Sequence, residues 1–175
     1  MNKRVFFAVN FPEETKKEIN RKYWLKLGKK GIKRVMEKNL HITLLFLGHF
    51  PEEKIKEIKE KAEKIKKEKF SVKLEGIGSF KKRIIFLGIK KGSENIIELK
   101  KELCGKMEIP FEGFEAHATI ARNKKMNAGE FTGLIKELQK IQFEKEIEIK
   151  SFELMESVNS FSGTEYKKLF SFNLL

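Results

Sequence analysis

Residues 40–48 read L-H-I-T-L-L-F-L-G, an apolar run with the length of a buried β-strand and two polar side chains placed within it. Side chains two residues apart in a strand point to the same face. His41 and Thr43 are therefore expected to project together, while Ile42 and Leu44 pack on the other side. The stretch predicts a strand with one small polar face that includes a titratable imidazole.

The same arrangement returns in the second half of the chain, at H-A-T-I-A-R, residues 117–122. His117 and Thr119 again share a face of a short apolar strand, and Arg122 closes the stretch. A single H-x-T is a weak signal. Two of the three histidines carry a threonine two positions on, which random placement would produce roughly once in a few hundred such compositions. The repeat therefore predicts a duplicated element with a function.

Further elements are expected on both sides of the two histidine strands, from hydrophobic periodicity and from turn residues. In the first half these are a strand over 4–10, a helix from Pro12 to about Leu27, a short strand over 32–36 and an amphipathic helix over 52–67. In the second half they are strands over 70–80 and 83–89, a helix over 93–107 capped by Ser93, a helix over 130–142, and closing strands over 147–158 and 166–174 around a turn at 160–164.

Strands and helices in this mixed order, with several hairpin-like joins, favour an α+β fold with mainly antiparallel sheets flanked by helices. No linker-like stretch divides the chain, so residues 1–175 are expected to form a single domain with two pseudo-symmetric lobes. If each lobe contributes one histidine strand, the two imidazoles face each other across a cleft between the lobes. Such a cleft is where a ligand binds.

Composition limits the classes of partner and of compartment. A formal charge of +13 and an isoelectric point near 9.7 favour an anionic partner, nucleic acid first, although much of the lysine lies in mixed-sign helical runs. The single cysteine, Cys104, excludes an internal disulfide framework and a thiolate metal cluster, and it is expected to be a half-buried helix residue. No apolar run is long enough for a signal peptide or a membrane span, so a cytoplasmic location is expected.

Two imidazoles facing one cleft suit displacement at phosphorus, because each titrates near neutrality and one can act as base while the other acts as acid. The hydroxyls of Thr43 and Thr119 can donate hydrogen bonds to phosphoryl oxygens, and Arg122 adds a fixed positive charge. Such a site needs no metal and no cofactor.

Two other interpretations of the histidines stay open. Either could be a hydrogen-bonded core residue, as histidines in apolar strands often are, although the repetition argues against this. Metal ligation by His41 and His117 is disfavoured because neither motif contains an H-x-H, an H-E-x-x-H or an acidic residue. His49, which lacks a threonine partner, is expected to be exposed.

The two motifs resemble the signatures of the two-histidine phosphoesterase superfamily, specifically its RNA 2',3'-cyclic phosphodiesterase branch, also called 2'-5' RNA ligase. The opening R-V-F-F-A-V-N-F-P, the G-I-G-S-F stretch and the closing G-T-E-Y are similar to family elements in the family's order. Ala118 and Ile120 stand where an isoleucine and a leucine are commoner, and His49 replaces an acid. None of these departures touches a catalytic position.

The resemblance implies metal-independent hydrolysis of a terminal 2',3'-cyclic phosphate of RNA to a 2'-phosphate, with ligation as the reverse reaction. It assigns His41 as proton donor, His117 as proton acceptor, and Thr43, Thr119 and Arg122 as phosphate ligands. The expected partner is RNA with a cyclic phosphate end, such as a transfer RNA fragment. The protein itself is expected to be a monomer. Two alternatives stay open: a related enzyme acting on small cyclic nucleotides or on ADP-ribose cyclic phosphate, and an RNA-binding module without catalysis.

Overall fold

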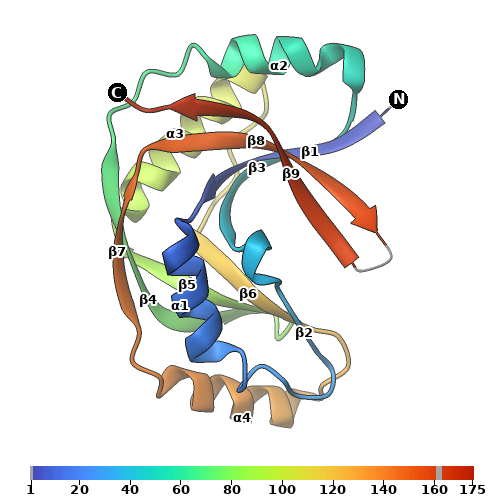
Figure 1. Ribbon diagram of the computed structural model, residues 1–175, viewed down its shortest axis with the longest axis vertical. Coiled ribbons are helices and arrows are strands. Elements are labelled where there is room, and N and C mark those ends of the chain that lie inside the picture. The colour runs from blue at the N-terminus through green and yellow to red at the C-terminus, as the bar shows by residue number, and fades with distance from the viewer. Residues whose placement is uncertain (1, 161–162) are drawn as a thin grey trace.

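The computed structural model describes residues 2–160 and 163–175, and Figure 1 shows the arrangement of their helices and strands. The strands are β1 (Asn2–Asn10), β2 (Ile32–Arg34), β3 (His41–Pro51), β4 (Phe70–Phe80), β5 (Ile84–Lys91), β6 (His117–Asn123), β7 (Glu144–Ile149), β8 (Ser151–Ser160) and β9 (Gly163–Asn173). The helices are α1 (Glu13–Tyr23), α2 (Ile55–Ala62), α3 (Ser93–Met107) and α4 (Ala128–Gln139), with short 3-10 turns at Glu37–Asn39 and Glu52–Lys54.

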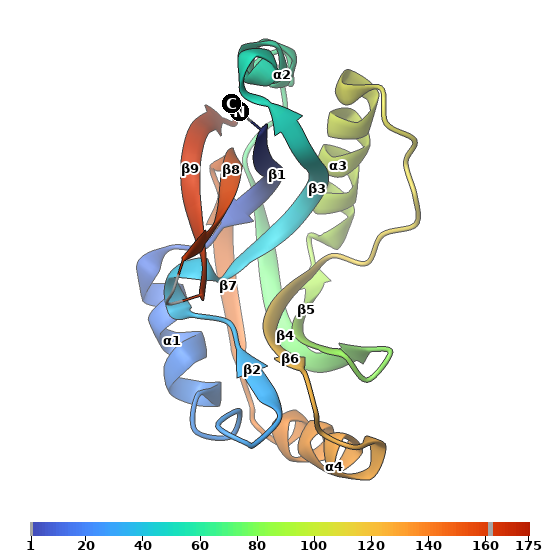
Figure 2. The same ribbon diagram turned by 90° about the vertical axis from the view of Figure 1, so that its right-hand side faces the viewer.

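Over these described residues, nine strands join in one curled sheet in which every pairing is antiparallel. The strand order is β7-β4-β5-β6-β3-β1-β8-β9, and β2 pairs with β6. In Figures 1 and 2 the half built on β1, β3, β8 and β9 carries α2 and α3, and the half built on β4, β5 and β6 carries α4. The predicted α+β fold with two antiparallel lobes is confirmed.

The two halves of the sheet meet where the two histidine strands meet. β3 and β6 lie side by side, with a single residue pair in register between them, Ile42 opposite Ala118. Both side chains are fully buried. The pairing is short because β6 is also bonded to β5 and, at its far end, to β2. The short contact leaves the strands free to diverge on either side of it.

Alternation along β1 separates two hydrophobic clusters. Val5 and Phe7 enter the main core, which the helices cover. Phe6 and Ala8 point to the opposite face of the strand, where a small second cluster forms and Tyr166 of β9 packs against it. Because period-two alternation places neighbours on opposite faces, the run of apolar residues in β1 supplies both clusters. The second cluster lies on the cleft side of the sheet, next to the first histidine.

Two predicted helices end earlier than their periodicity indicates. α1 ends at Tyr23, not Leu27, because the carbonyl oxygen of Trp24 accepts a 3.1 Å hydrogen bond from Nη1 of Arg34 and Gly28 bonds to Leu25 instead. α2 ends at Ala62. Beyond it Ile65 bonds back to Ala62 in a turn, and the carbonyl oxygen of Lys67 accepts a 2.9 Å hydrogen bond from the backbone N–H of Leu175. Neither end follows from the periodicity of the helix itself.

The helices of the second half also differ in detail from the prediction. Ser93 is not the N-cap of α3; Gly92 takes that position with φ near 78°, and a Cβ there would collide with the backbone oxygen of Ser71. Cys104 of α3 is buried rather than half-buried, and burial raises the pKa of its thiol, as suits a structural residue. α4 covers Ala128–Gln139, slightly before the predicted 130–142.

The predicted closing strand over 147–158 is wrong as one element. It divides at Lys150 into β7, which pairs with β4, and β8, which pairs with β1 and β9. The alternation is continuous, but the chain passes there from one half of the sheet to the other. The hairpin of β8 and β9 is confirmed, and the turn predicted at 160–164 falls partly on residues 161–162, outside the described residues.

Candidate active site

The pairing of β3 with β6 brings the two H-x-T motifs together. Since Ile42 and Ala118 are opposite each other and buried, the residues on either side of each point to the other face of the sheet. Those residues are His41, Thr43, His117 and Thr119, and all four are half-buried. Because the described parts of β3 and β6 pair only at Ile42 and Ala118, the two H-x-T motifs flank the same point of the sheet. The shared polar face expected from the sequence is present.

One nitrogen of the His41 ring is bonded to the backbone. Nδ1 lies 2.7 Å from the carbonyl oxygen of Asn39, and because a carbonyl accepts hydrogen bonds, Nδ1 carries the proton. Nε2 is 2.9 Å from Oγ1 of Thr43. In the neutral ring Nε2 therefore accepts the threonine hydroxyl, and in the charged ring it donates to it. Nε2 is the nitrogen available for chemistry.

His117 is held in the same way by its own strand. Its Nδ1 lies 2.7 Å from the carbonyl oxygen of Glu115, again the residue two positions earlier. Among the described residues Nε2 of His117 has no hydrogen-bond partner, in contrast to Nε2 of His41. The two rings are thus fixed in the same tautomer by equivalent backbone contacts, and each directs Nε2 away from its own backbone.

Asn39 holds the first histidine to the C-terminal hairpin. Its amide group, on a buried side chain, donates a 2.7 Å hydrogen bond to the carbonyl oxygen of Thr164, while its own carbonyl accepts from His41. Beside it, Lys38 forms a 2.7 Å ion pair with Glu165. The position of the His41 ring therefore depends on β9, which lies far away in the sequence. The H-x-T pattern carries no signal for this role of Asn39.

Aromatic rings pack against both imidazoles. The His41 ring contacts Phe6 at a centroid distance of 5.3 Å and Tyr166 at 5.2 Å in an edge-on contact, and these two rings also contact each other at 5.0 Å. His117 is met edge-on by Phe80 at 4.9 Å and is tilted against Phe86 at 5.2 Å. Phe6 and Tyr166 belong to the sequence stretches R-V-F-F and G-T-E-Y, but periodicity alone does not reveal that these rings reach a histidine.

The electrostatic setting of His41 favours its neutral form. Burial lowers the pKa of His41 from 6.5 to about 4, and the charges of Lys16, Arg122 and His117 act in the same direction. The bond to the carbonyl of Asn39 opposes this shift but is outweighed. The free protein therefore holds an uncharged His41 ring at neutral pH.

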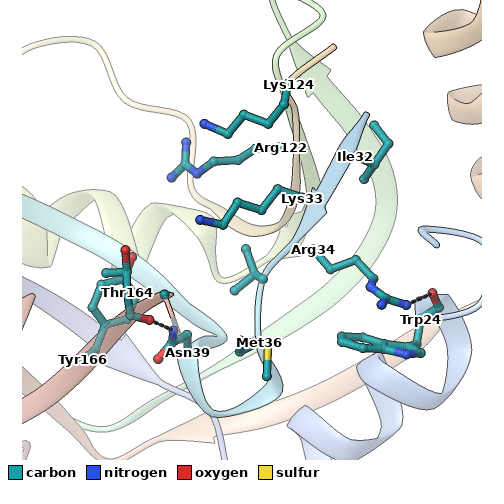
Figure 3. Close-up of a pocket in the computed structure, with 12 residues that line it drawn as sticks. Trp24, Ile32, Lys33, Arg34, Met36, Asn39, Arg122, Lys124, Thr164 and Tyr166 are labelled. Carbon is teal, nitrogen blue, oxygen red and sulfur yellow. Dashed lines mark hydrogen bonds between the residues drawn. The ribbon is translucent and has the colours of Figure 1, made fainter. Parts of the chain in front are cut away.

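Arg122 and the C-terminal hairpin line a pocket of about 490 Å³ beside the histidines, shown in Figure 3. Asn39 and Tyr166, which contact His41, are part of its wall. In Figure 3 Arg122 and Lys33 extend in the same direction, whereas Arg34 turns back over Trp24. The sequence analysis selected Arg122, but it did not predict the pocket that Arg122 lines.

Three further observations concern other groups in the described part of the chain. His49 is exposed, as predicted. No three histidine, cysteine or acidic side chains there gather where they could hold a metal ion. Among the same residues no helix is long and apolar enough to cross a membrane.

The model of the LigT-like phosphoesterases matches the chain twice, over residues 9–86 and 87–163. The chain belongs to this family. The two matches divide the chain between its two H-x-T motifs, in agreement with the duplicated element in the sequence. The resemblance drawn from the two motifs is confirmed, and so is the prediction that the chain is an enzyme, a phosphoesterase.

Similar proteins are known over nearly the whole length of this LigT-like chain. An RNA 2',3'-cyclic phosphodiesterase from Archaeoglobus fulgidus is 30% identical over 176 residues, covering 95% of this chain and 97% of the relative. One from Methanocaldococcus jannaschii is 34% identical over 173 residues, covering 94% and 96%. The crystal structure of Escherichia coli LigT in complex with 3'-AMP has a TM-score of 0.84 at 23% identity, covering 99% of both chains, and shows that the fold is shared.

Proposed function

We propose that the chain hydrolyses the terminal 2',3'-cyclic phosphate of RNA to a 2'-phosphate, with His41 and His117 as a metal-independent acid-base pair. The observation that carries the proposal is the matched placement of the two rings. Each Nδ1 is bonded to the carbonyl oxygen two residues earlier, so each Nε2 is left for proton transfer. The curated relatives from two archaea, named RNA 2',3'-cyclic phosphodiesterase, support the choice of substrate.

In the proposed reaction a water oxygen attacks phosphorus and the bond between phosphorus and O3' breaks. Nε2 of His117 takes a proton from the water as the new bond forms. Nε2 of His41 gives its proton to the departing O3', which leaves as a hydroxyl. The products are a 2'-phosphate and a free 3'-hydroxyl. Exchange with solvent then restores the protonation states of the two rings.

The phosphate is held by the remaining groups of the polar face in this proposal. The hydroxyls of Thr43 and Thr119 donate to the non-bridging oxygens, and Arg122 offsets the charge that develops on them. In the free protein the Thr43 hydroxyl lies against Nε2 of His41, so substrate must take over that contact. When the Thr43 hydroxyl turns from Nε2 of His41 to the phosphate, Nε2 becomes free to contact the leaving oxygen.

The assignment of His41 as the acid sets a requirement on the pKa of its ring. Its pKa of about 4 in the free protein leaves the ring uncharged at neutral pH, whereas a proton donor must be charged. An anionic phosphate placed against Nε2 favours the charged ring and raises the pKa. The proposal therefore requires that substrate binding itself charges His41.

Five further parts of the proposal go beyond the activity itself. By microscopic reversibility the enzyme joins 2',3'-cyclic and 5'-hydroxyl ends in a 2'-5' linkage. We propose transfer RNA fragments as substrates, a monomer as the working form and the cytoplasm as its location. We also propose that residues 1–175 act as one two-lobed domain, which the continuous sheet supports.

The test is an oligonucleotide that ends in a 2',3'-cyclic phosphate, incubated with the enzyme and followed by analysis of its end. The expected product carries a 2'-phosphate and a 3'-hydroxyl. A 3'-phosphate product would contradict the proposed leaving oxygen. Faster turnover of mononucleotide cyclic phosphates than of any RNA would instead favour the alternative enzyme for small cyclic nucleotides, and binding without turnover would favour the RNA-binding module.

A further inference from the structure

The pocket beside the histidines is strongly basic. Lys33 on β2, Arg122 on β6 and Lys124 just beyond β6 line it, and in Figure 3 the three side chains extend side by side. Of the residues described, those that line the pocket include no aspartate or glutamate. Three positive charges thus share one wall without a negative charge among them.

The backbone forces these charges together. Lys33 and Arg122 are partners in the antiparallel pairing of β2 with β6, and the backbone N–H of Lys124 donates a 2.7 Å bond to the carbonyl oxygen of Gly31. Like charges directly across a strand pair destabilise it. Within residues 2–160 and 163–175 none of the three cations forms an ion pair, although all three lysines of α2 do. An anion bound between them would relieve the repulsion.

Arg34 belongs to the wall in a different way. Its guanidinium lies 3.4 Å from the centroid of the Trp24 ring and donates to the carbonyl oxygen of Trp24. This charge is already engaged and is directed away from the other three in Figure 3. The free positive charge of the pocket therefore comes from Lys33, Arg122 and Lys124.

The pocket adjoins the histidine site directly. Tyr166 contacts the ring of His41 and also lines the pocket, as does Asn39, and Arg122 lies close enough to lower the pKa of His41. At about 490 Å³ the pocket has the size of a site for a nucleotide-sized ligand. An RNA strand whose terminal nucleotide lies between the histidines would place its next nucleotide in this pocket.

We infer that Lys33 and Lys124 bind the phosphodiester on the 5' side of the terminal nucleotide, so that the enzyme recognises the end of a strand. The inference rests on the proposed function. A nucleotide with a 2',3'-cyclic phosphate has a neighbour on its 5' side alone, so the next phosphate in reach of a site beside the histidines is that one. Arg122, whose side chain lies between those of the two lysines in Figure 3, binds the reacting phosphate. The two lysines bind the next phosphate of the RNA.

A pair of dinucleotides tests the inference. Both end in a 2',3'-cyclic phosphate, but one has an ordinary phosphodiester between its nucleosides and the other an uncharged methylphosphonate. The wild-type enzyme is expected to prefer the charged dinucleotide in kcat/KM by at least about tenfold, the effect of one hydrogen bond to a charged group. The variant with both Lys33→Gln and Lys124→Gln is expected to lose most of that preference.

Lys125→Gln is the matched control. Lys125 is exposed, follows Lys124 in the same loop and does not line the pocket, so this variant is expected to keep the wild-type preference. Circular dichroism checks that all variants are folded. An unchanged preference in the double variant, or an equal loss in the control, would overturn the inference.

A failure of the proposed function can be distinguished from a failure of this inference. If the wild-type enzyme hydrolyses neither dinucleotide, equilibrium binding is measured instead, with the two dinucleotides carrying a terminal 2'-phosphate. Tighter binding of the charged dinucleotide that disappears in the double variant would support the lysine site without the reaction. Equal binding of both dinucleotides would reject it.

Discussion

At each histidine, one backbone carbonyl engages Nδ1 and so determines which ring nitrogen faces away from the backbone. The carbonyls of Asn39 and Glu115 each bond to Nδ1 of the histidine two residues later, at 2.7 Å in both cases. A ring fixed in this way loses little orientational freedom when the reaction begins. The same contact therefore orients the histidine of each motif in the same way.

Replacing either histidine is expected to abolish hydrolysis of the cyclic phosphate. His41→Ala and His117→Ala should each lower kcat by ~100- to 10,000-fold, because each removes one half of a proton-transfer pair. The double variant should be little worse than either single one, since neither group works without the other. Rates are measured on a cyclic-phosphate oligonucleotide, with unfolding curves as the check on folding. Losses that multiply fully would show that the histidines act in different steps.

The proposed proton-donor role of His41 predicts a rise of its pKa on ligand binding. In the free protein burial and nearby cations set the pKa to about 4, so the ring is expected to titrate well below 6.5. A phosphate monoester in the site adds a negative charge beside Nε2 and should shift the titration upward. Nuclear magnetic resonance of the ring, with and without a nucleoside 2'-phosphate, measures both values. If the ligand leaves the pKa near 4, His41 acts as the base.

Among the elements, β3 and β6 have the largest effect on the site because they bring both motifs to the line where the halves of the sheet meet. Their contact is one residue pair long, and β1 and β5 on either side hold the two strands in place. The helices act at a distance. α3 packs on β3 and α4 packs on β4, so each half of the sheet has its own covering helix.

The N-terminus of α4 offers a test of stability that leaves the histidines untouched. Asn127 accepts a 3.0 Å bond from the backbone of Glu130, and the Glu130 side chain bonds back to the backbone N–H of Asn127. Asn127→Ala should lower the free energy of unfolding by about 1 kcal/mol. Asn127→Asp keeps the acceptor and adds a favourable charge at the helix start, so it should cost much less. Equal losses in denaturant unfolding would contradict the capping role.

For the molecule as a whole, the net charge of +13 acts on RNA over a longer range than the cleft does. Much of this charge is locally balanced. On α2, Lys56, Lys59 and Lys61 each pair with a glutamate on the same helix face. The cations of the pocket wall have no such partners in the described chain, so charge near the cleft and charge on the helices should have different effects.

A salt series on two substrates separates these effects. Arg122→Ala or Thr119→Val should lower turnover of both a long RNA and a minimal cyclic nucleotide, at low and at high salt, because both act on the reacting phosphate. Lys56→Gln should matter at most for the long RNA at low salt, where counterion release contributes to binding. Turnover is measured for each variant across the series. An Arg122→Ala enzyme impaired on long RNA alone would place Arg122 outside the catalytic site.

Hydrolysis should be independent of metal ions. The proposed site relies on imidazoles, hydroxyls and a guanidinium, which supply proton transfer and charge stabilisation themselves. Exhaustive treatment with a chelator should therefore leave kcat unchanged. Loss of activity that added zinc restores would instead favour ligation of a metal by the histidines.

The sequence by itself determined which residues share a face and what chemistry they offer. Period-two alternation identified His41 with Thr43 and His117 with Thr119, and repetition of the motif marked both pairs as functional. It also located most strands and helices and the family, because local periodicity and short motifs are properties of neighbouring residues.

Only the tertiary structure decided which strands are neighbours and what surrounds the two histidines. The pairing of Ile42 with Ala118 and the contacts of Phe6 and Tyr166 with the His41 ring all join residues distant in the chain. Such contacts depend on packing and charge summed over the whole molecule. No local pattern specifies them, and for that reason the basic pocket beside His41 became visible only in the folded chain.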